Sequence, residues 1–138
     1  MARLDSVADA SPDWGRARLQ LAHQYRDQAK QLIDLNDTGS GNPAMSLCVS
    51  AAIAYVDAVT AVVGLKRSTG EHASALKLLR DVMRNKLEDK VGKAFNKLLN
   101  QKSEVQYGVK SFQFNDAAEA HALVVTIGEW AEGILAAT

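Results

Sequence analysis

The stretch PAMSLCVSAAIAYVDAVTAVVGL, residues 43–65, decides the fold of this chain. Asp57 is its only charged residue, and its apolar residues are not confined to one helical face, which is typical of a helix packed on several sides by neighbours. The run is also about long enough to cross a membrane, but Ser46, Ser50 and Thr60 interrupt it. We therefore expect a central buried helix and no membrane association.

An amphipathic helix is predicted before this segment. Ser11 has the preference of a helix cap, Pro12 that of a first helical position, and apolar residues recur at three- and four-residue steps to about Leu35. The turn-forming run NDTGSGNP, residues 36–43, then connects the two helices, with Asn42 as the predicted cap of the second.

Further helices are predicted after residue 65. Ser68 and Glu71 have capping-box spacing ahead of a third helix, whose apolar periodicity changes phase at Asn85 before another short amphipathic stretch over residues 87–99. A last helix is predicted to begin at Asn115 or Asp116, with Asp116 and Glu119 again at capping-box spacing.

These elements predict an all-α, up-and-down bundle of four to five helices. No segment alternates with a period of two, so no strand is expected. A chain of 138 residues is a normal size for one domain, and we assign residues 11–138 to it, after a disordered lead over residues 1–10. The single cysteine, Cys48, is flanked by apolar residues, which indicates a buried thiol and a reducing compartment; we expect cytoplasmic localisation.

Charge is unevenly distributed although the formal net charge is zero. Residues 66–110 contain eleven Lys or Arg against five acids, and the remainder has the opposite balance. Within the basic region, Lys86, Lys90, Lys93 and Lys97 recur at helical spacing, beside a similar stripe of Lys77, Arg80 and Arg84. These stripes predict contacts with RNA phosphates or with an acidic protein; the alternative is a solvated helix face.

Few catalytic motifs are present. His23, His72 and His121 lie far apart and lack metal-ligand spacing, and there is no glycine-rich phosphate loop, so no metal and no cofactor are expected. Asp57 is costly in so apolar a helix unless it is paired. It either ties this helix to a neighbour or lines a polar cleft.

The segment AAIAYVDAVTAVVGLKRSTGEH, residues 51–72, followed by LLNQKSEVQYG, residues 98–108, and a last amphipathic helix, resembles the HEPN superfamily of helical bundles, particularly its small bacterial members. The shared features are an acid in the second helix, a glycine-rich turn with a histidine, and a later basic motif that ends in Tyr-Gly. The matching positions are Asp57, Gly64, Gly70, His72, Leu98, Leu99, Lys102, Tyr107 and Gly108. The resemblance covers roughly residues 43 to 135 and implies a homodimer associated with toxin–antitoxin, phage-defence or RNA-processing systems.

Catalytic HEPN members use an Arg and a His, a few residues apart, to cleave RNA without metal. Here Lys102 stands at the Arg position, and Gln106 or Tyr107 stands where the His would be. Glutamine exchanges no proton at neutral pH, and tyrosine is a poor base. The resemblance therefore implies a non-catalytic module that binds RNA, a nucleotide or a cognate protein near Lys102, Tyr107, Asp57 and His72.

Two alternatives remain. In the first, the chain is a metal-independent endoribonuclease with Lys102 and Tyr107 as catalytic residues and His72 as the source of an imidazole, which requires His72 within hydrogen-bond reach of the reaction. In the second, it is a structural or immunity-type interaction protein whose lysine stripe docks an acidic partner. The predicted binding residues are Asp57, Gln106, Lys90, Lys93 and Lys97.

Overall fold

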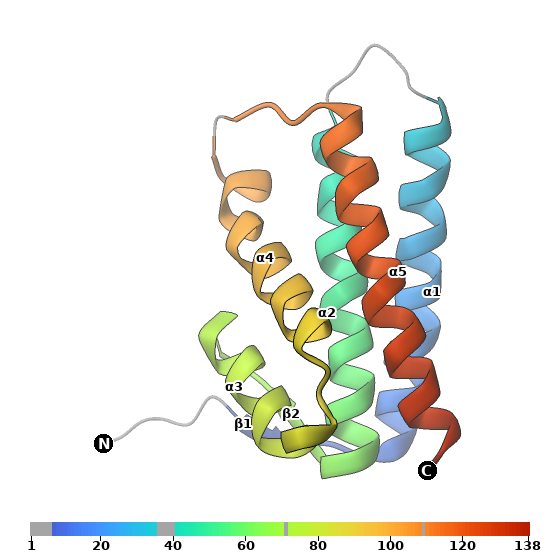
Figure 1. Ribbon diagram of the computed structural model, residues 1–138, viewed down its shortest axis with the longest axis vertical. Coiled ribbons are helices and arrows are strands. Elements are labelled where there is room, and N and C mark those ends of the chain that lie inside the picture. The colour runs from blue at the N-terminus through green and yellow to red at the C-terminus, as the bar shows by residue number, and fades with distance from the viewer. Residues whose placement is uncertain (1–6, 36–40, 71, 109) are drawn as a thin grey trace.

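The computed structural model describes residues 7–35, 41–70, 72–108 and 110–138. In this part of the chain there are five α-helices: α1 (Pro12–Leu35), α2 (Asn42–Gly64), α3 (His72–Met83), α4 (Asp89–Gln106) and α5 (Phe114–Ala136). A short 3-10 turn, η1 (Arg84–Lys86), and two strands, β1 (Val7–Asp9) and β2 (Lys66–Ser68), complete the fold (Figure 1). The predicted all-α bundle of four to five helices is confirmed.

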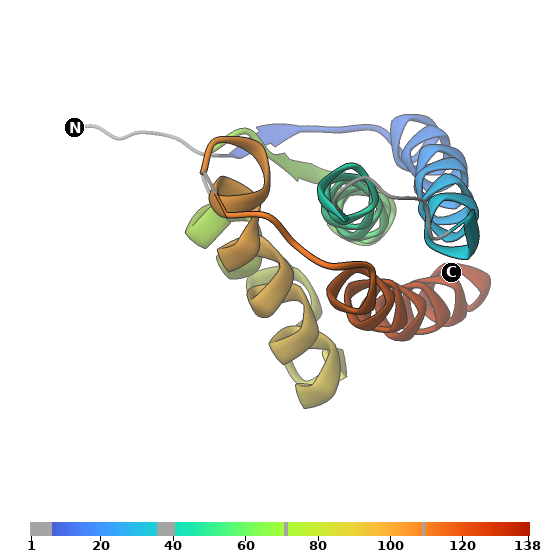
Figure 2. The same ribbon diagram turned by 90° about the horizontal axis from the view of Figure 1, so that it is seen from above.

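Helix α2 is the centre of the bundle. Figure 2 shows it between α1 on one side and the α3–α4 pair on the other, with α5 along a third side. Its side chains are buried on nearly all faces, including Met45, Tyr55 and Val59. Cys48 is also buried, and burial raises the pKa of its thiol to about 12, as expected for an unreactive cysteine.

By length and composition α2 also resembles a membrane span, and 61% of its most apolar window is buried within the bundle. A soluble protein's core helix has the same composition, because neighbours cover it on several sides. The buried central helix expected from residues 43–65 is confirmed, and the absence of membrane association stays a prediction.

The third helical region consists of two separate helices. The apolar phase changes at Asn85, and here the chain leaves α3, passes through η1 and turns back into α4 (Figure 1). Arg84 has a φ of 52°, in the left-handed region, and Leu87 is extended. The Trp130 indole N–H on α5 donates a hydrogen bond to the Lys86 carbonyl at 3.2 Å, which ties this turn to the bundle.

The expectation of no strand is wrong for six residues. β1 and β2 pair antiparallel, with Val7 opposite Ser68 and Asp9 opposite Lys66, so residues 7–9 of the predicted disordered lead are ordered. Leu65 has a φ of 56° and reverses the chain after α2, and its carbonyl accepts a hydrogen bond from the Ala10 N–H at 3.0 Å. Strands of three residues are too short to display a period of two.

Three predicted caps differ in outcome. Ser11 caps α1, since its Oγ accepts a hydrogen bond from the Trp14 N–H at 3.0 Å. The predicted start of α5 is one or two residues late, because the helix begins at Phe114, and the capping box is formed by Gln113 and Asp116 rather than by Asp116 and Glu119. Glu71 lies outside the described residues, and Ser68 belongs to β2.

Asn42 is not the cap of α2, which is Gly41. Its side chain instead holds the segment before α5: Oδ1 accepts a hydrogen bond from the Phe112 N–H at 2.7 Å, and Nδ2 donates to the Lys110 carbonyl at 3.1 Å. The Gly41 N–H also donates to the Phe112 carbonyl at 2.7 Å. Asn42 therefore joins the start of α2 to the α4–α5 connection.

Substitution of Asn42 by Ala is expected to lower the free energy of unfolding by about 2 kcal/mol, because it removes the side-chain hydrogen bonds to Lys110 and Phe112 and leaves the Phe112 N–H without its acceptor. Chemical denaturation measures the change. Asn100→Ala, on the exposed face of α4, is the control and should change stability by no more than about 0.5 kcal/mol. Equal effects of the two substitutions would contradict the role given to Asn42.

Candidate functional site

Asp57 has the ionic partner that the sequence requires. The Arg18 guanidinium on α1 donates from Nε and approaches with Nη2, each 3.2 Å from Asp57 Oδ2, and the Asp57 side chain is 14% exposed. Burial raises the pKa of Asp57 to about 6, although the charges of Arg18 and Arg67 oppose that rise. Asp57 therefore ties α2 to α1.

Asp57 also lines a small hollow, so the two interpretations of this residue are both correct. The hollow has a volume of about 90 Å³, and its walls come from α2, the β2 region, α3 and α4. Its lining residues are Ile53, Asp57, Ser68, Gly70, Ala75, Leu99 and Lys102. The Ser68 Oγ is buried and has no hydrogen-bond partner among the described residues. The fold thus brings Lys102 and Asp57 together, 45 positions apart in the chain.

The other predicted catalytic residues are not part of this hollow. Tyr107 follows the last turn of α4 and is 83% exposed, and Gln106 is also exposed. His72 is the first residue of α3, and its side chain lies outside the described part of the structure. The supply of an imidazole by His72 therefore stays a prediction.

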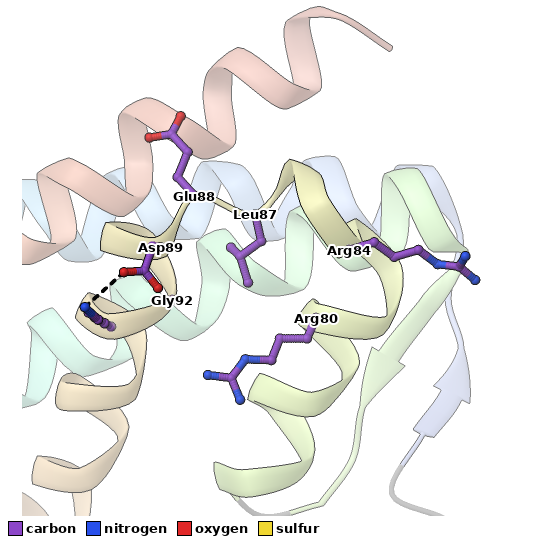
Figure 3. Close-up of a pocket in the computed structure, with 7 residues that line it drawn as sticks. Arg80, Arg84, Leu87, Glu88, Asp89 and Gly92 are labelled. Carbon is purple, nitrogen blue, oxygen red and sulfur yellow. Dashed lines mark ion pairs between the residues drawn. The ribbon is translucent and has the colours of Figure 1, made fainter.

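A larger hollow, of about 440 Å³, lies between the end of α3 and the start of α4; we call it the α3–α4 cleft. It is lined by Arg80, Arg84, Leu87, Glu88, Asp89, Gly92 and Lys93. Figure 3 shows the Arg80 guanidinium extending from α3 toward the first turn of α4, where Asp89 pairs with Lys93, while Arg84 points away. The turn at residues 84–88, in which Arg84 has a left-handed backbone conformation, separates the end of α3 from the start of α4.

All seven residues of the predicted basic stripes are exposed, and Arg80, Arg84 and Lys93 line this cleft. In α4, Lys90, Lys93 and Lys97 are exposed and face away from the buried Phe95 and Leu98. We call the full set the α3–α4 cationic face; it consists of Lys77, Arg80, Arg84, Lys86, Lys90, Lys93 and Lys97.

Carboxylates neutralise only part of the α3–α4 cationic face. Lys77 pairs with Asp81 at 2.7 Å, Lys93 with Asp89 at 2.9 Å and Lys90 with Glu88 at 3.8 Å. No acidic side chain within the described ranges pairs with the remaining four cations, Arg80, Arg84, Lys86 and Lys97. This arrangement suits an anionic ligand with several charges in a row.

Sequence reasoning missed a third cluster, between α1 and α5. A hollow of about 270 Å³, which we call the α1–α5 hollow, is lined by Arg26, Tyr55, His121, Val125, Gly128, Glu129 and Glu132. His23 lies beside it, with Nε2 3.1 Å from Glu132 Oε1 and its ring 5.9 Å from that of Tyr55. Because these residues come from three helices far apart in the chain, no local motif reveals them.

In the part of the chain that the structure describes, no three His, Cys, Asp or Glu side chains are grouped so as to hold a metal ion. The α1–α5 hollow thus combines acid, base and hydrogen-bonding groups without a metal-binding arrangement.

Comparison with known proteins gives no relative: no protein-family model and no curated protein matches this chain. Membership of the HEPN superfamily therefore stays a prediction from the residues quoted above.

Proposed function

We propose that this chain is a HEPN-like, non-catalytic module that binds RNA through the α3–α4 cationic face. One observation carries the proposal: the Arg80 guanidinium extends toward α4 in a cleft of about 440 Å³ that Lys93 also lines, and neither Arg80 nor the neighbouring Arg84 has an acidic partner among the described residues. Guanidinium groups suit phosphates, because their N–H groups contact two oxygens of one phosphate together.

The charge balance of this face supports a polyanionic ligand. Residues 77–97 contain seven cations and three carboxylates, on a chain whose net charge is zero. Lys90 and Lys97 are seven residues apart on α4, which places their Cα atoms about 10 Å apart along the helix. The row is long enough for a run of phosphates rather than a single anion. The HEPN resemblance, rather than the charge, selects RNA over DNA.

The absence of catalysis in this proposal rests on the environments of the candidate catalytic residues. Lys102 lines the small hollow with Asp57, whereas Tyr107 lies in solvent beyond the end of α4. Metal-independent cleavage needs a proton-transferring group within hydrogen-bond reach of the phosphate and its neighbours. Because Tyr107 does not line the hollow that contains Lys102, this arrangement favours binding over cleavage.

Binding should depend strongly on salt. If three or four cations of this face contact a single-stranded RNA, the logarithm of the association constant should fall with the logarithm of the salt concentration with a slope of about −2 to −3. Fluorescence anisotropy with a labelled single-stranded RNA of mixed sequence measures this slope.

Arg80→Glu should weaken RNA binding by about tenfold and reduce the magnitude of the salt slope by about 1, because it replaces a free cation in the cleft with an anion. Arg16→Glu is the matched control, since Arg16 is exposed on α1, away from this face. Equal affinities of the two variants would mean that the stripe is only a solvated face.

Cleavage is tested with the same protein and RNA in EDTA. We expect the RNA to stay intact; cleavage that disappears in Lys102→Ala and Tyr107→Phe would instead establish the endoribonuclease. Absence of RNA binding at low salt would reject the proposal and favour the third interpretation, an acidic protein partner for the same lysines.

A further inference from the structure

Tyr55 forms the buried end of the α1–α5 hollow. Its side chain is fully buried, and its hydroxyl accepts a hydrogen bond from Arg26 Nη1 at 2.9 Å. The hydroxyl's own hydrogen has no acceptor among the described residues. Gly128 on α5 makes room for this phenol, since a Cβ there would lie 2.9 Å from the Tyr55 oxygen. Tyr55 is therefore covered by its neighbours, and its role at this end is to hold the Arg26 guanidinium.

Arg26 is the accessible hydrogen-bond donor at this end. Its Nε donates to Asp27 Oδ1 at 2.8 Å and its Nη1 to Tyr55, so Nη2 is left for another acceptor. The Arg26 side chain is 29% exposed, which is compatible with contact to a ligand from solvent. Hydrogen-bonding to Asp27 raises the pKa of Arg26, so the group stays charged.

His121 lines the same wall and has a defined tautomer. Its Nε2 lies 3.2 Å from the Arg26 carbonyl, and a carbonyl can only accept, so Nε2 carries the hydrogen. Its Nδ1 has no partner within the described ranges and accepts a hydrogen bond when the ring is neutral.

The solvent side of the hollow has the opposite character. Glu129 and Glu132 are both exposed and lie on α5. Glu132 uses Oε1 to accept from His23, whereas no cation in the described part of the chain pairs with Glu129. Val125 adds an apolar contact, being a large hydrophobic residue with 36% exposure. The Arg26 guanidinium thus lies at the buried end and the carboxylates at the mouth.

We propose that the α1–α5 hollow binds a small zwitterion, whose carboxylate contacts Arg26 and whose ammonium group contacts Glu129. A single anion would meet the two glutamates at the mouth, whereas a zwitterion can hydrogen-bond with Arg26 and pair with Glu129 at the same time. A volume of about 270 Å³ is just below the range of pockets for drug-sized ligands, which suits a free amino acid. This site does not depend on the proposed RNA binding, because none of its lining residues belongs to the α3–α4 cationic face.

Titration followed by NMR tests the charge pattern directly. The probes are three zwitterions of different span, L-leucine, 4-aminobutanoate and 6-aminohexanoate, beside two singly charged analogues, butanoate and butylamine. We expect at least one zwitterion to bind saturably and about tenfold more tightly than either analogue, with shifts of the Tyr55 and His121 ring signals. No saturable binding, or equal binding of an analogue, would overturn the proposal.

Substitutions of Glu129 and Arg26 test the contacts of the ligand's ammonium group and of its carboxylate separately. Glu129→Gln should lower the affinity for the zwitterion about tenfold. Glu119→Gln should leave this affinity unchanged, because Glu119 is exposed on α5 outside the hollow. Arg26→Gln should weaken it as well, with Arg16→Gln as its control. Equal affinity of Glu129→Gln and Glu119→Gln would place the ammonium group elsewhere and reject the assignment, even if Arg26→Gln proved poorly folded.

Discussion

Between pH 4 and pH 7 the wild-type protein is expected to lose about 3 kcal/mol of its free energy of unfolding relative to the Asp57→Asn variant. Burial raises the pKa of Asp57 from 3.8 to about 6, so the folded state binds this proton more tightly than the unfolded chain does. The stabilising contribution is therefore fully present below pH 4 and is lost as the pH rises through 6. Asn cannot titrate, and the variant lacks this loss.

Urea denaturation at several pH values measures the effect as the difference between the wild-type protein and Asp57→Asn. Other carboxyl groups, such as Asp9 and Asp27, whose pKa values are lowered by their ion pairs, contribute to both proteins and cancel. Removal of the cation by Arg18→Met should steepen the decline with pH, because Arg18 partly offsets the cost of burial. Parallel stability curves for the wild-type protein and Asp57→Asn would show that Asp57 keeps an ordinary pKa.

Much of the fold follows from local pattern. An apolar run with one charge predicted the buried α2, and the phase change at Asn85 predicted a break, because both signals lie within one or two helical turns. Asp57 also required a partner on physical grounds alone, and Arg18 supplies it. The basic stripe on α4 was equally readable, since residues three and four apart share a helix face.

The remaining features depend on contacts between distant segments. Asn42 has the residue type of a helix cap, yet its side chain holds Lys110 and Phe112, and only the packed bundle brings these together. β1 and β2 are ordered by pairing with each other rather than by their own sequences. His23 and His121 looked isolated because their shared environment forms only when α1 packs against α5.

Gly128 illustrates the same limit, and it yields the second large expected effect. Gly128→Val should lower the free energy of unfolding by about 2 to 4 kcal/mol. A Cβ at this position would lie 2.7 Å from Cζ and 2.9 Å from Cε2 of Tyr55, closer than side chains approach one another. The ring cannot move aside without cost, because Tyr55 is fully buried and its hydroxyl is held by Arg26.

Gly133→Val is the matched control, since it lies on the same helix and a Cβ there meets no atom within 4 Å. Valine is a slightly better helix former than glycine, so this control should be neutral or slightly stabilising in thermal and urea denaturation. Adding Tyr55→Leu to Gly128→Val replaces the opposing ring with a smaller side chain and should recover part of the lost free energy of unfolding. The two sites are in contact, so the effects of the two substitutions should not be additive. If Gly128→Val were as stable as Gly133→Val, α5 would have room to shift away from α2, and the phenol would not form a fixed end to the α1–α5 hollow.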